Sequence, residues 1–489
     1  MQKIGRASAQ VAGRFLFLGV SVQILLGICW GVRSFGIFPE FGDSYTWLKA
    51  SETLVCDDYM GIGYPLFLML VKGIESMSSI PYTFFVYTVQ ILIAFYAGVI
   101  FLRACGVTGK KIFLCWGSLA LLTFPCAMQS HLAVLPNSPG YSFLLLELSA
   151  VIRILRQDAV AEDGETTAPD RPLHGLFEAG IWWALSTLCV VENLYLGLVP
   201  LIVLWLIHLW QLRSRKTEKK RVGRELLLLL AMAGILFTLV PMWQTPGSYG
   251  KAENTVSAAM MRRFSWTHMR EEEEYDEWPE QLRTWMTWKE MRNAGYYAGT
   301  MESGIQKTLE DRFGKAGAQK IFREYAGYHL KTYTSDNIHQ IAWDCLGYAM
   351  PTVLLQLLLD GRGYDSFSGR NVDIMMTGDP RLTELLLKYS SWWFLSGIAV
   401  VVVSGMICGI IAMRRQKKEK TVPDRSLFWK ISGVCVITAA GMILWYTMRD
   451  AGCLDYKNGL LPGSLWLVGM ILWTDRTISA GDTEDNPEK

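Results

Sequence analysis

The chain has 489 residues, of which 51% are hydrophobic, and its formal net charge is +2. This near-neutral charge provides no overall basic field that would attract nucleic acid, so nucleic-acid binding is not expected. Several uninterrupted apolar runs approach the roughly 20 residues that a helix needs to cross a bilayer, which argues against a soluble fold. The composition therefore predicts an all-α membrane protein.

We predict about ten transmembrane helices, which in chain order cover residues 15–35, 80–103, 112–128, 140–156, 176–191, 193–210, 225–243, 391–412, 427–446 and 459–474. Basic residues collect in alternate connections, as in LRSRKTEKKRVGR at 212–224 and RRQKKEK at 414–420. Cytoplasmic loops of membrane proteins carry an excess of Lys and Arg, so these clusters all fall inside if the N-terminus is cytoplasmic. Both termini are then cytoplasmic, and we expect a multi-pass protein of the cell membrane.

The predicted helices divide the chain into four regions. An N-terminal transmembrane catalytic region with seven helices covers 1–244, and an extracytoplasmic, mostly helical insertion covers 245–390. A C-terminal region with three transmembrane helices covers 391–478, and a disordered cytoplasmic tail covers 479–489. Within the insertion we expect a helical hairpin around Gly314 and an apolar helix that is broken near Pro351.

The first outer loop, residues 36–79, is expected to contain interfacial helices. Apolar residues recur at helical spacing from Trp47 to Val55, which predicts a helix with one face along the membrane surface. The segment GYPLFLMLVKGIESM at 63–77 is apolar but too short to span, so it is interpreted as a surface or re-entrant helix. Together these helices would form a lid around Asp43.

Polar residues collect in each of four predicted outer loops. The first carries Asp43, and the second and third carry the turns MQSHLAVLPNSPG and VVENLYLG. The last is MRDAGCLDYKNGLLPG at 448–463, directly before the final helix. Four loops that are far apart in the sequence therefore deliver polar side chains to one face of the membrane.

These motifs together resemble a polytopic glycosyltransferase of the GT-C superfamily. The resemblance depends on the D-S pair in the first outer loop followed by G-Y-P-L-F-L, and on the turns L-P-N-S-P-G, E-N-L-Y and D-Y-K-N-G-L-L-P in that order. It covers about residues 10–245 and 390–475 and is similar to the branch of the protein O-mannosyltransferases and the bacterial lipid A aminoarabinose transferase. The family donors are sugars on polyprenyl phosphate, and the segment that corresponds to 245–390 often houses acceptor recognition.

The resemblance implies that Asp43 is the catalytic base, because family members have an Asp in the first outer loop. Many members have a second acidic residue where this chain has Ser44, and the second outer turn often has an acidic residue where this chain has Asn137. No metal site is therefore predicted, no cofactor is firmly implied, and a divalent cation has no support from these positions.

The chemistry of such a transfer points to the same residues. A polyprenyl-phosphate donor has a good leaving group whose developing charge needs a cation, and the acceptor hydroxyl needs a base for an inverting displacement. Asp43 would be the base, and either Lys457 or Arg449 would hold the phosphate. Glu192 and His131 would orient the sugar or the acceptor. The predicted substrate-binding set also includes Asn137 and Tyr456. The acceptor is a protein, a lipid or a cell-wall polymer.

Simpler interpretations of these residues stay open. Asp43 would also cap a helix that begins near Ser44, and Lys457 would also reach the membrane surface from a helix end. Glu192 as a hydrogen-bond acceptor in a turn and His131 as an ordinary interfacial residue are the structural alternatives. For the whole chain, the alternatives are a lipid-linked polysaccharide polymerase or ligase and a polytopic transporter or flippase, although a transporter would carry ionisable groups near the membrane midplane.

Overall fold

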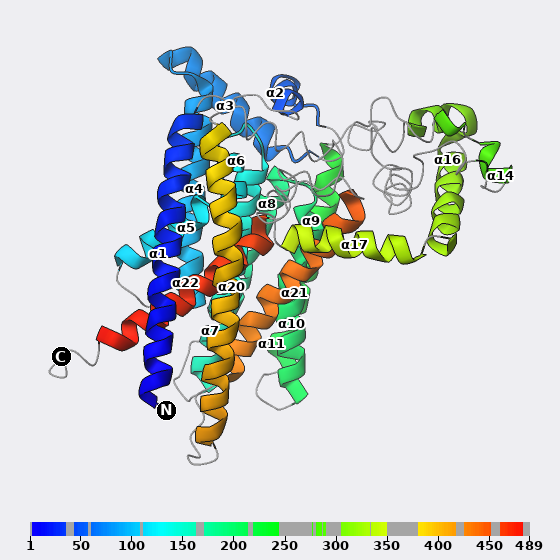
Figure 1. Cartoon of the computed structure of the whole chain (residues 1–489). Coiled ribbons are helices and arrows are strands. Elements are labelled where there is room, and N and C mark those ends of the chain that lie inside the picture. Colours follow the sequence, from blue (N-terminus) through cyan, green and yellow to red (C-terminus); the bar gives the residue numbers. More distant parts are fainter. Residues whose placement is uncertain are drawn as a thin grey trace.

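The computed structural model is helical throughout the residues that it describes, which are 2–35, 44–56, 60–107, 111–162, 171–213, 219–243, 276, 280–285, 287–289, 305–332, 334–349, 380–416, 425–450 and 460–482. Within these ranges the only strand-like pairing is an isolated antiparallel bridge between Met60 and Val190. The predicted all-α class is therefore confirmed for the described part of the chain (Figure 1).

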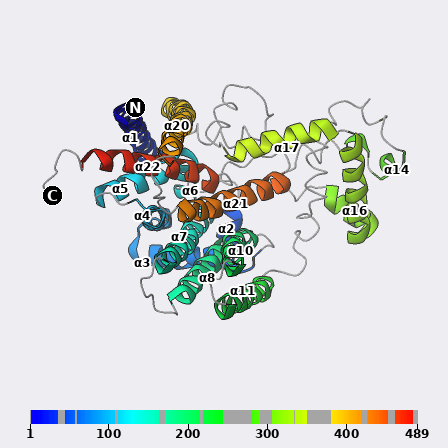
Figure 2. The ribbon, with the colours of Figure 1, turned by 90° about the horizontal axis from the view of Figure 1, so that it is seen from below.

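Two long helices that are far apart in the sequence lie side by side (Figures 1 and 2). They are α1 (Gln2–Ser34) and α20 (Pro380–Gln416). The buried indole Nε1 of Trp30 on α1 donates a hydrogen bond of 2.8 Å to Oγ1 of Thr383 on α20. A polar pair of this kind is favoured between packed helices, because buried polar groups need hydrogen-bond partners within the protein.

The N-terminal half forms a packed set of helices around α7. Its members are α4 (Tyr82–Cys105), α5 (Lys111–Leu122), α7 (Asn137–Glu162), α8 (Arg171–Cys189), α10 (Leu198–Arg213) and α11 (Lys219–Leu239). The apolar window of α7 is 89% buried inside the protein, whereas that of α11 is only 22% buried. α7 is therefore the central helix of this half, and α11 exposes most of its apolar side chains to the surroundings.

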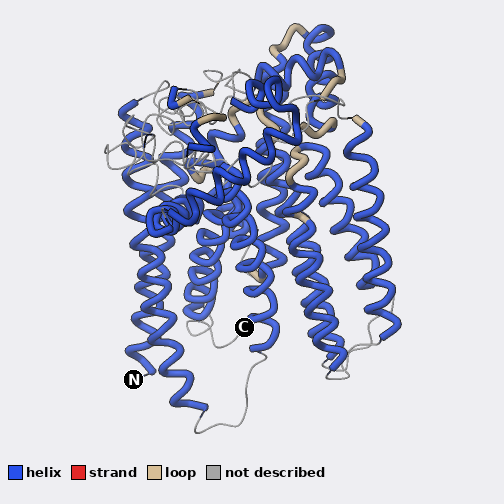
Figure 3. The backbone as a smooth tube through the Cα atoms, turned by 90° about the vertical axis from the view of Figure 1, so that its right-hand side faces the viewer, coloured by secondary structure: helices blue, strands red, loops and turns tan. Residues whose placement is uncertain are grey.

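Short helices gather at one end of the bundle, which is the upper end in Figure 1. They are α2 (Ser44–Thr53), α3 (Gly63–Ser78), α6 (Pro125–His131) and α9 (Asn193–Leu196). The start of α1, the start of α11 and the end of α20 lie at the lower end, and Figure 3 shows the N-terminus at this end from the side. The predicted outer loops and the helix ends beside the basic clusters therefore occupy opposite ends of the bundle.

Two further helices complete the bundle, and both run obliquely to α1 and α20 (Figure 1). They are α21 (Arg425–Asp450) and α22 (Leu460–Asp482). The residues between them, 451–459, lie outside the described part of the chain. These two helices therefore flank the last predicted outer loop.

The prediction of ten transmembrane helices is wrong for the described residues, which contain six helices long and apolar enough to cross a membrane. These candidate spans are Gln10–Ser34, Tyr82–Cys105, Asn137–Ala159, Asn193–Leu212, Lys219–Met242 and Lys430–Thr447. Six such helices, identified by their length and composition, support a multi-pass membrane protein.

The four remaining predicted segments are helical but are not among the six. Residues 112–128 divide between α5, with 12 residues, and α6, which begins at Pro125, because proline has no N–H to continue a helix. The apolar part of α22 covers 460–475, which is too short to span. Residues 176–191 fall mainly in α8, which carries Glu178, and 391–412 form part of α20.

The first outer loop forms the two expected helices, but the face of α2 differs from the prediction. Trp47 and Leu48 are buried in the protein, and the Trp47 ring meets the Tyr64 ring of α3 edge-on with centroids 5.7 Å apart. Leu54 and Val55 are exposed. The apolar side of α2 therefore packs mainly against α3, because a neighbouring helix covers the same apolar surface that a membrane would cover.

The described helices of the insertion are α14 (Glu280–Arg283), α16 (Ile305–Thr332) and α17 (Thr334–Ala349). Where a helical hairpin was predicted, α16 has a kink at Gly314, where φ is 70°. The predicted break near Pro351 lies outside the described residues. α17 contacts the bundle through Tyr348, whose ring lies 5.9 Å from that of Tyr446 on α21.

Candidate functional site

The predicted site residues are only partly within the described structure. Asp43, Tyr456 and Lys457 lie outside it, and Arg449 lies in the last turn of α21, where the backbone alone is described. His131, Asn137 and Glu192 are described with their side chains. The geometry of the site must therefore be built from these three residues and from the described residues that border the others in the chain.

The first outer loop contacts the second outer turn directly after Asp43. α2 begins at Ser44, as the capping interpretation of Asp43 predicts. The hydroxyl of Ser44 donates a hydrogen bond of 2.9 Å to the carbonyl of Val134, and the Ser44 side chain is fully buried. Val134 lies in the α6–α7 turn, residues 132–136, which His131 and Asn137 flank. Ser44, the residue that follows Asp43 in the sequence, is therefore held against this turn.

The first outer loop also contacts the third outer turn. Met60 forms its bridge with Val190, two residues before Glu192. Gly61 permits this close approach, because a Cβ built there would lie 2.1 Å from the carbonyl oxygen of Leu188. Any larger residue at this position would push the loop away from the end of α8.

The second and third turns are joined through Ser186 near the end of α8. Its hydroxyl donates to the carbonyl of Gly140 in the first turn of α7 at 2.8 Å. It also accepts a hydrogen bond of 2.7 Å from the side-chain amide of Asn193, the residue after Glu192. All three residues are buried, so this connection is insulated from solvent.

The last outer loop is anchored to the same end of the bundle at both of its sides. Before the loop, the Trp445 ring on α21 stacks on the Tyr195 ring of α9, with centroids 5.4 Å apart. After the loop, Ser464 in α22 accepts a hydrogen bond of 2.6 Å from the hydroxyl of Tyr141 in α7. Arg449 follows Trp445 by one helical turn, and Lys457 precedes Ser464 by two turns' length of chain. Described contacts thus connect the first three predicted loops, and the two helices that flank the last loop contact the same group of helices.

His131 is not an ordinary interfacial residue, because its side chain is fully buried. Its Nδ1 lies 2.7 Å from the hydroxyl of Ser138, the second residue of α7. Burial lowers the pKa of His131 to about 3, so the imidazole is neutral at physiological pH. In this arrangement the ring supports the start of α7 and does not face solvent.

Asn137 and Glu192 are only partly covered. Asn137 is the first residue of α7 and is half-buried. Glu192 precedes α9 and is also half-buried, and its backbone carbonyl accepts hydrogen bonds from Tyr195 N–H at 3.0 Å and from Leu196 N–H at 3.2 Å. Of the three described site residues, Asn137 and Glu192 are therefore the two whose side chains a substrate at the upper end could contact.

The sequence interpretation missed the buried polar residues of the transmembrane helices. Gln90 of α4 is 1% exposed, and Glu147 of α7 is fully buried with no hydrogen-bond partner for either carboxyl oxygen among the described residues. Their positions in the sequence could have indicated them, because Gln90 and Glu147 lie inside predicted spans. A polar or ionisable side chain is costly in a membrane and usually has a structural or functional role there.

A second polar group lies toward the lower end, between α7, α10 and α11. We call it the polar cluster, and it comprises Asp158, His208, Arg221 and Glu225. Both acids accept from Arg221, at 2.7 and 2.8 Å for the oxygens of Asp158 and at 2.9 Å for Oε1 of Glu225. His208 Nδ1 lies 2.7 Å from Oε2 of Glu225. His208 Nε2 is 2.9 Å from Oδ2 of Asp158, within ion-pair distance although its N–H is not aligned for a hydrogen bond.

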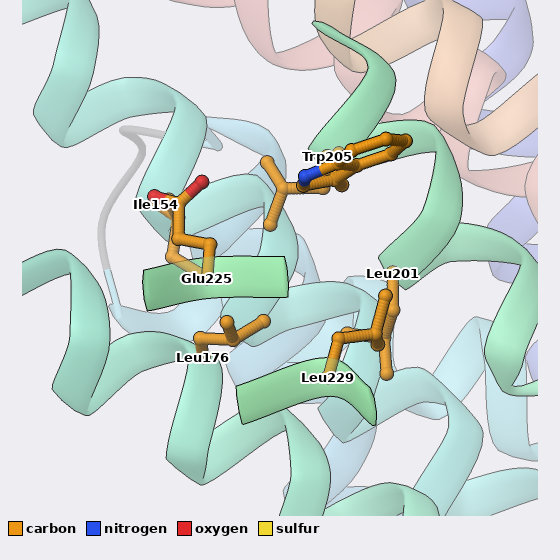
Figure 4. A pocket seen from close by; sticks show the side chains of 7 residues that line it. Ile154, Leu176, Leu201, Trp205, Glu225 and Leu229 are labelled. Atoms are coloured by element: carbon orange, nitrogen blue, oxygen red, sulfur yellow. The ribbon is translucent and has the colours of Figure 1, made fainter. Parts of the chain in front are cut away.

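A small cavity adjoins the polar cluster (Figure 4). Its volume is about 10 Å³, and Trp205, Glu225 and five aliphatic side chains line it. A cavity of this size accommodates about one water molecule. It is therefore too small for a substrate and belongs to the interior of the helix bundle.

The described residues contain no group of three or more His, Cys, Asp or Glu side chains that could hold a metal ion. A comparison with known proteins finds no family model, no curated protein and no solved structure that matches this chain.

Proposed function

We propose that the chain is a membrane glycosyltransferase of the GT-C type, which moves a sugar from polyprenyl phosphate to an acceptor at the outer face of a bacterial cytoplasmic membrane. The acceptor is a protein, a lipid or a cell-wall polymer. The proposal extends the resemblance of the loop motifs to a reaction, and it assigns the site to the upper end of the bundle in Figure 1.

The observation that supports this proposal best is that three distant loops contact one another at one end of the bundle, and that the helices flanking the last loop pack against the same helices. Ser44 and Met60 tie the first loop to the second and third turns. The ring contact of Trp445 and the hydrogen bond of Ser464 tie the two sides of the last loop to the same helices. A catalyst that uses a carboxylate from the first loop and a cation from the last loop requires this convergence.

The proposed reaction is a single inverting displacement. The acceptor oxygen attacks the anomeric carbon while the carboxylate of Asp43 takes its proton. The bond between the anomeric carbon and the phosphate oxygen breaks, and polyprenyl phosphate leaves with the bonding electrons. Lys457 or Arg449 stabilises the negative charge that develops on the phosphate. Asn137 and Glu192 orient the sugar or the acceptor, and His131 contributes through the start of α7.

The proposal is tested with purified protein in lipid vesicles, supplied with labelled polyprenyl-phosphate sugars and a panel of acceptors. We expect label to move from the lipid to one class of acceptor. Retention of all label on the lipid with every donor and acceptor class would contradict the proposed function.

Asp43→Asn should reduce transfer at least about 100-fold, because the amide cannot take the proton of the acceptor. Asp58→Asn is the matched control, since it removes a carboxylate from the same outer loop and should keep most of the activity. The measurement is the initial rate of label transfer at equal amounts of folded protein. Full activity of the Asp43 variant would remove this residue from the role of base.

A further inference from the structure

Gln90 occupies a position that connects the first outer loop with the α6–α7 turn. It lies on α4, about two turns after the helix begins at Tyr82, and it is 1% exposed. Its side-chain NH₂ group donates hydrogen bonds of 3.0 Å each to the carbonyls of His131 and Ala133. Its Oε1 accepts a hydrogen bond of 3.2 Å from the hydroxyl of Tyr64 on α3.

The orientation of this amide follows from its partners. Backbone carbonyls only accept hydrogen bonds, so the NH₂ end must face His131 and Ala133, and the oxygen must face the hydroxyl of Tyr64. Both hydrogens and the oxygen of Gln90 are therefore used. No residue with an apolar side chain could replace these contacts. Their loss would remove one hydrogen bond from each of two carbonyls, although that of Ala133 would still accept from Leu135 N–H at 2.9 Å.

The two carbonyls belong to the segment that forms the site. The same segment carries Val134, whose carbonyl accepts from Ser44 directly after Asp43. His131 and Asn137 flank the turn on either side. Gln90 and Ser44 thus bind neighbouring carbonyls of this segment, and Tyr64 extends the connection to α3.

We propose that Gln90 is a positioning residue, which sets the α6–α7 turn against the start of α2 and so places Asn137 relative to Ser44. It does not contact the substrate and acts through the turn. The proposed function assigns no role to Gln90. The positioning of the turn is independent of that function, and only the expected effect on catalysis rests on it.

The test uses Gln90→Met, which keeps the length of the side chain but has no amide, and Gln90→Glu, which places an oxygen where the NH₂ group donates. In both variants we expect the turn to loosen and the imidazole of His131 to become accessible. The measurement is modification of His131 by diethylpyrocarbonate, read by mass spectrometry on vesicle-reconstituted protein. We expect at least a fivefold faster modification than in the wild type.

Gln23→Met is the matched control. Gln23 is also 1% exposed and also donates from its side chain to a backbone carbonyl, but it lies on α1 and this carbonyl, 3.3 Å away, is that of Ala120 in α5. Its loss should cost stability in a similar way while leaving His131 unreactive. Equal reactivity of His131 in the Gln23 and Gln90 variants would show a general loosening and would overturn the inference.

The effect on catalysis is read separately in the same preparations. We expect the Gln90 variants to lose at least tenfold in kcat with a smaller change in KM, and Gln23→Met to keep the wild-type kcat. If wild-type protein transfers no sugar but His131 becomes exposed only in the Gln90 variants, the proposed function fails and the positioning of the turn stands. If the wild type and the Gln90 variants transfer equally and His131 stays protected, the positioning inference fails.

Discussion

His131 shows at the scale of one residue how burial changes an ionisable group. Its ring is fully buried, and burial lowers its pKa from the usual 6.5 to about 3. The folded protein therefore keeps the ring neutral at a pH where the unfolded chain would protonate it. Because the unfolded chain binds a proton that the folded protein does not, the free energy of unfolding is highest above about pH 6.5. It decreases as the pH falls from there toward the folded pKa.

Replacing His131 should make the protein less sensitive to mild acid. The wild type should lose about 1.4 kcal/mol of unfolding free energy between about pH 8 and pH 5.5 through this residue alone. Over the same pH range, the free energy of unfolding of His131→Gln should fall by about 1.4 kcal/mol less than that of the wild type. At about pH 8 the variant should be less stable than the wild type. The measurement is reversible unfolding in detergent at both pH values. An identical pH dependence in the two proteins would show that the ring is not kept neutral.

The polar cluster acts at the scale of helices, because it joins three of them. His208 of α10 lies between Asp158 of α7 and Glu225 of α11, and Arg221 bridges the two acids. His208 Nδ1 lies 2.7 Å from Oε2 of Glu225 and Nε2 lies 2.9 Å from Oδ2 of Asp158, so the two acids favour the imidazolium form of the ring. Two positive and two negative groups then balance each other inside the bundle.

His208→Leu should destabilise the protein by roughly 3–5 kcal/mol, because it leaves two buried carboxylates with only one cation. The free energy of unfolding in detergent measures this loss. Lys388→Ala is the control, since the exposed pair of Lys388 with Glu384 on α20 should be worth less than about 0.5 kcal/mol. A loss under 1 kcal/mol for His208→Leu would mean that the cluster does not hold the three helices together.

At the scale of the whole molecule, the two ends of the bundle differ in what they carry. The upper end in Figure 1 holds α2, α6 and α9, and the lower end holds the junction of α10 with α11 beside the basic run at 212–224. Positive loops are retained in the cytoplasm, so the lower end should be cytoplasmic. The proposed site would then face outward.

Cysteine labelling tests this orientation. Tyr45→Cys on α2 and Lys219→Cys at the start of α11 both place a thiol at an exposed position. A maleimide that cannot cross membranes should label Cys at position 45 in intact cells, and Cys at position 219 only after the cells are opened. The unsubstituted protein gives the background from its own cysteines. The reverse pattern would place the proposed site in the cytoplasm and would contradict the proposed function.

The local features of this protein were predictable from its sequence. Apolar runs indicate helices, and a helix that begins near Ser44, a short helix over 63–77 and a change of direction near Gly314 were all expected. These features depend on neighbouring residues, whose spacing and conformational preferences are present in the chain itself. The number of spans was overestimated, because an apolar run such as 112–128 can also be divided by a proline and buried inside the protein.

The candidate site could be predicted only in part. The sequence indicated which loops carry polar residues, but not that Ser44 would bind Val134 or that Tyr141 would bind Ser464, 323 residues away. It also did not indicate that His131 would be enclosed or that Gln90 would bind the turn beside it.

By itself, then, the sequence determined the helical class, the membrane environment and the loops in which polar residues collect, because apolar length and charge act locally. Only the tertiary structure decided which distant helices pack together, which polar groups become buried partners and which turn joins the loops. Those outcomes depend on the mutual fit of surfaces and on hydrogen bonds between residues far apart in the chain, and no local pattern encodes them.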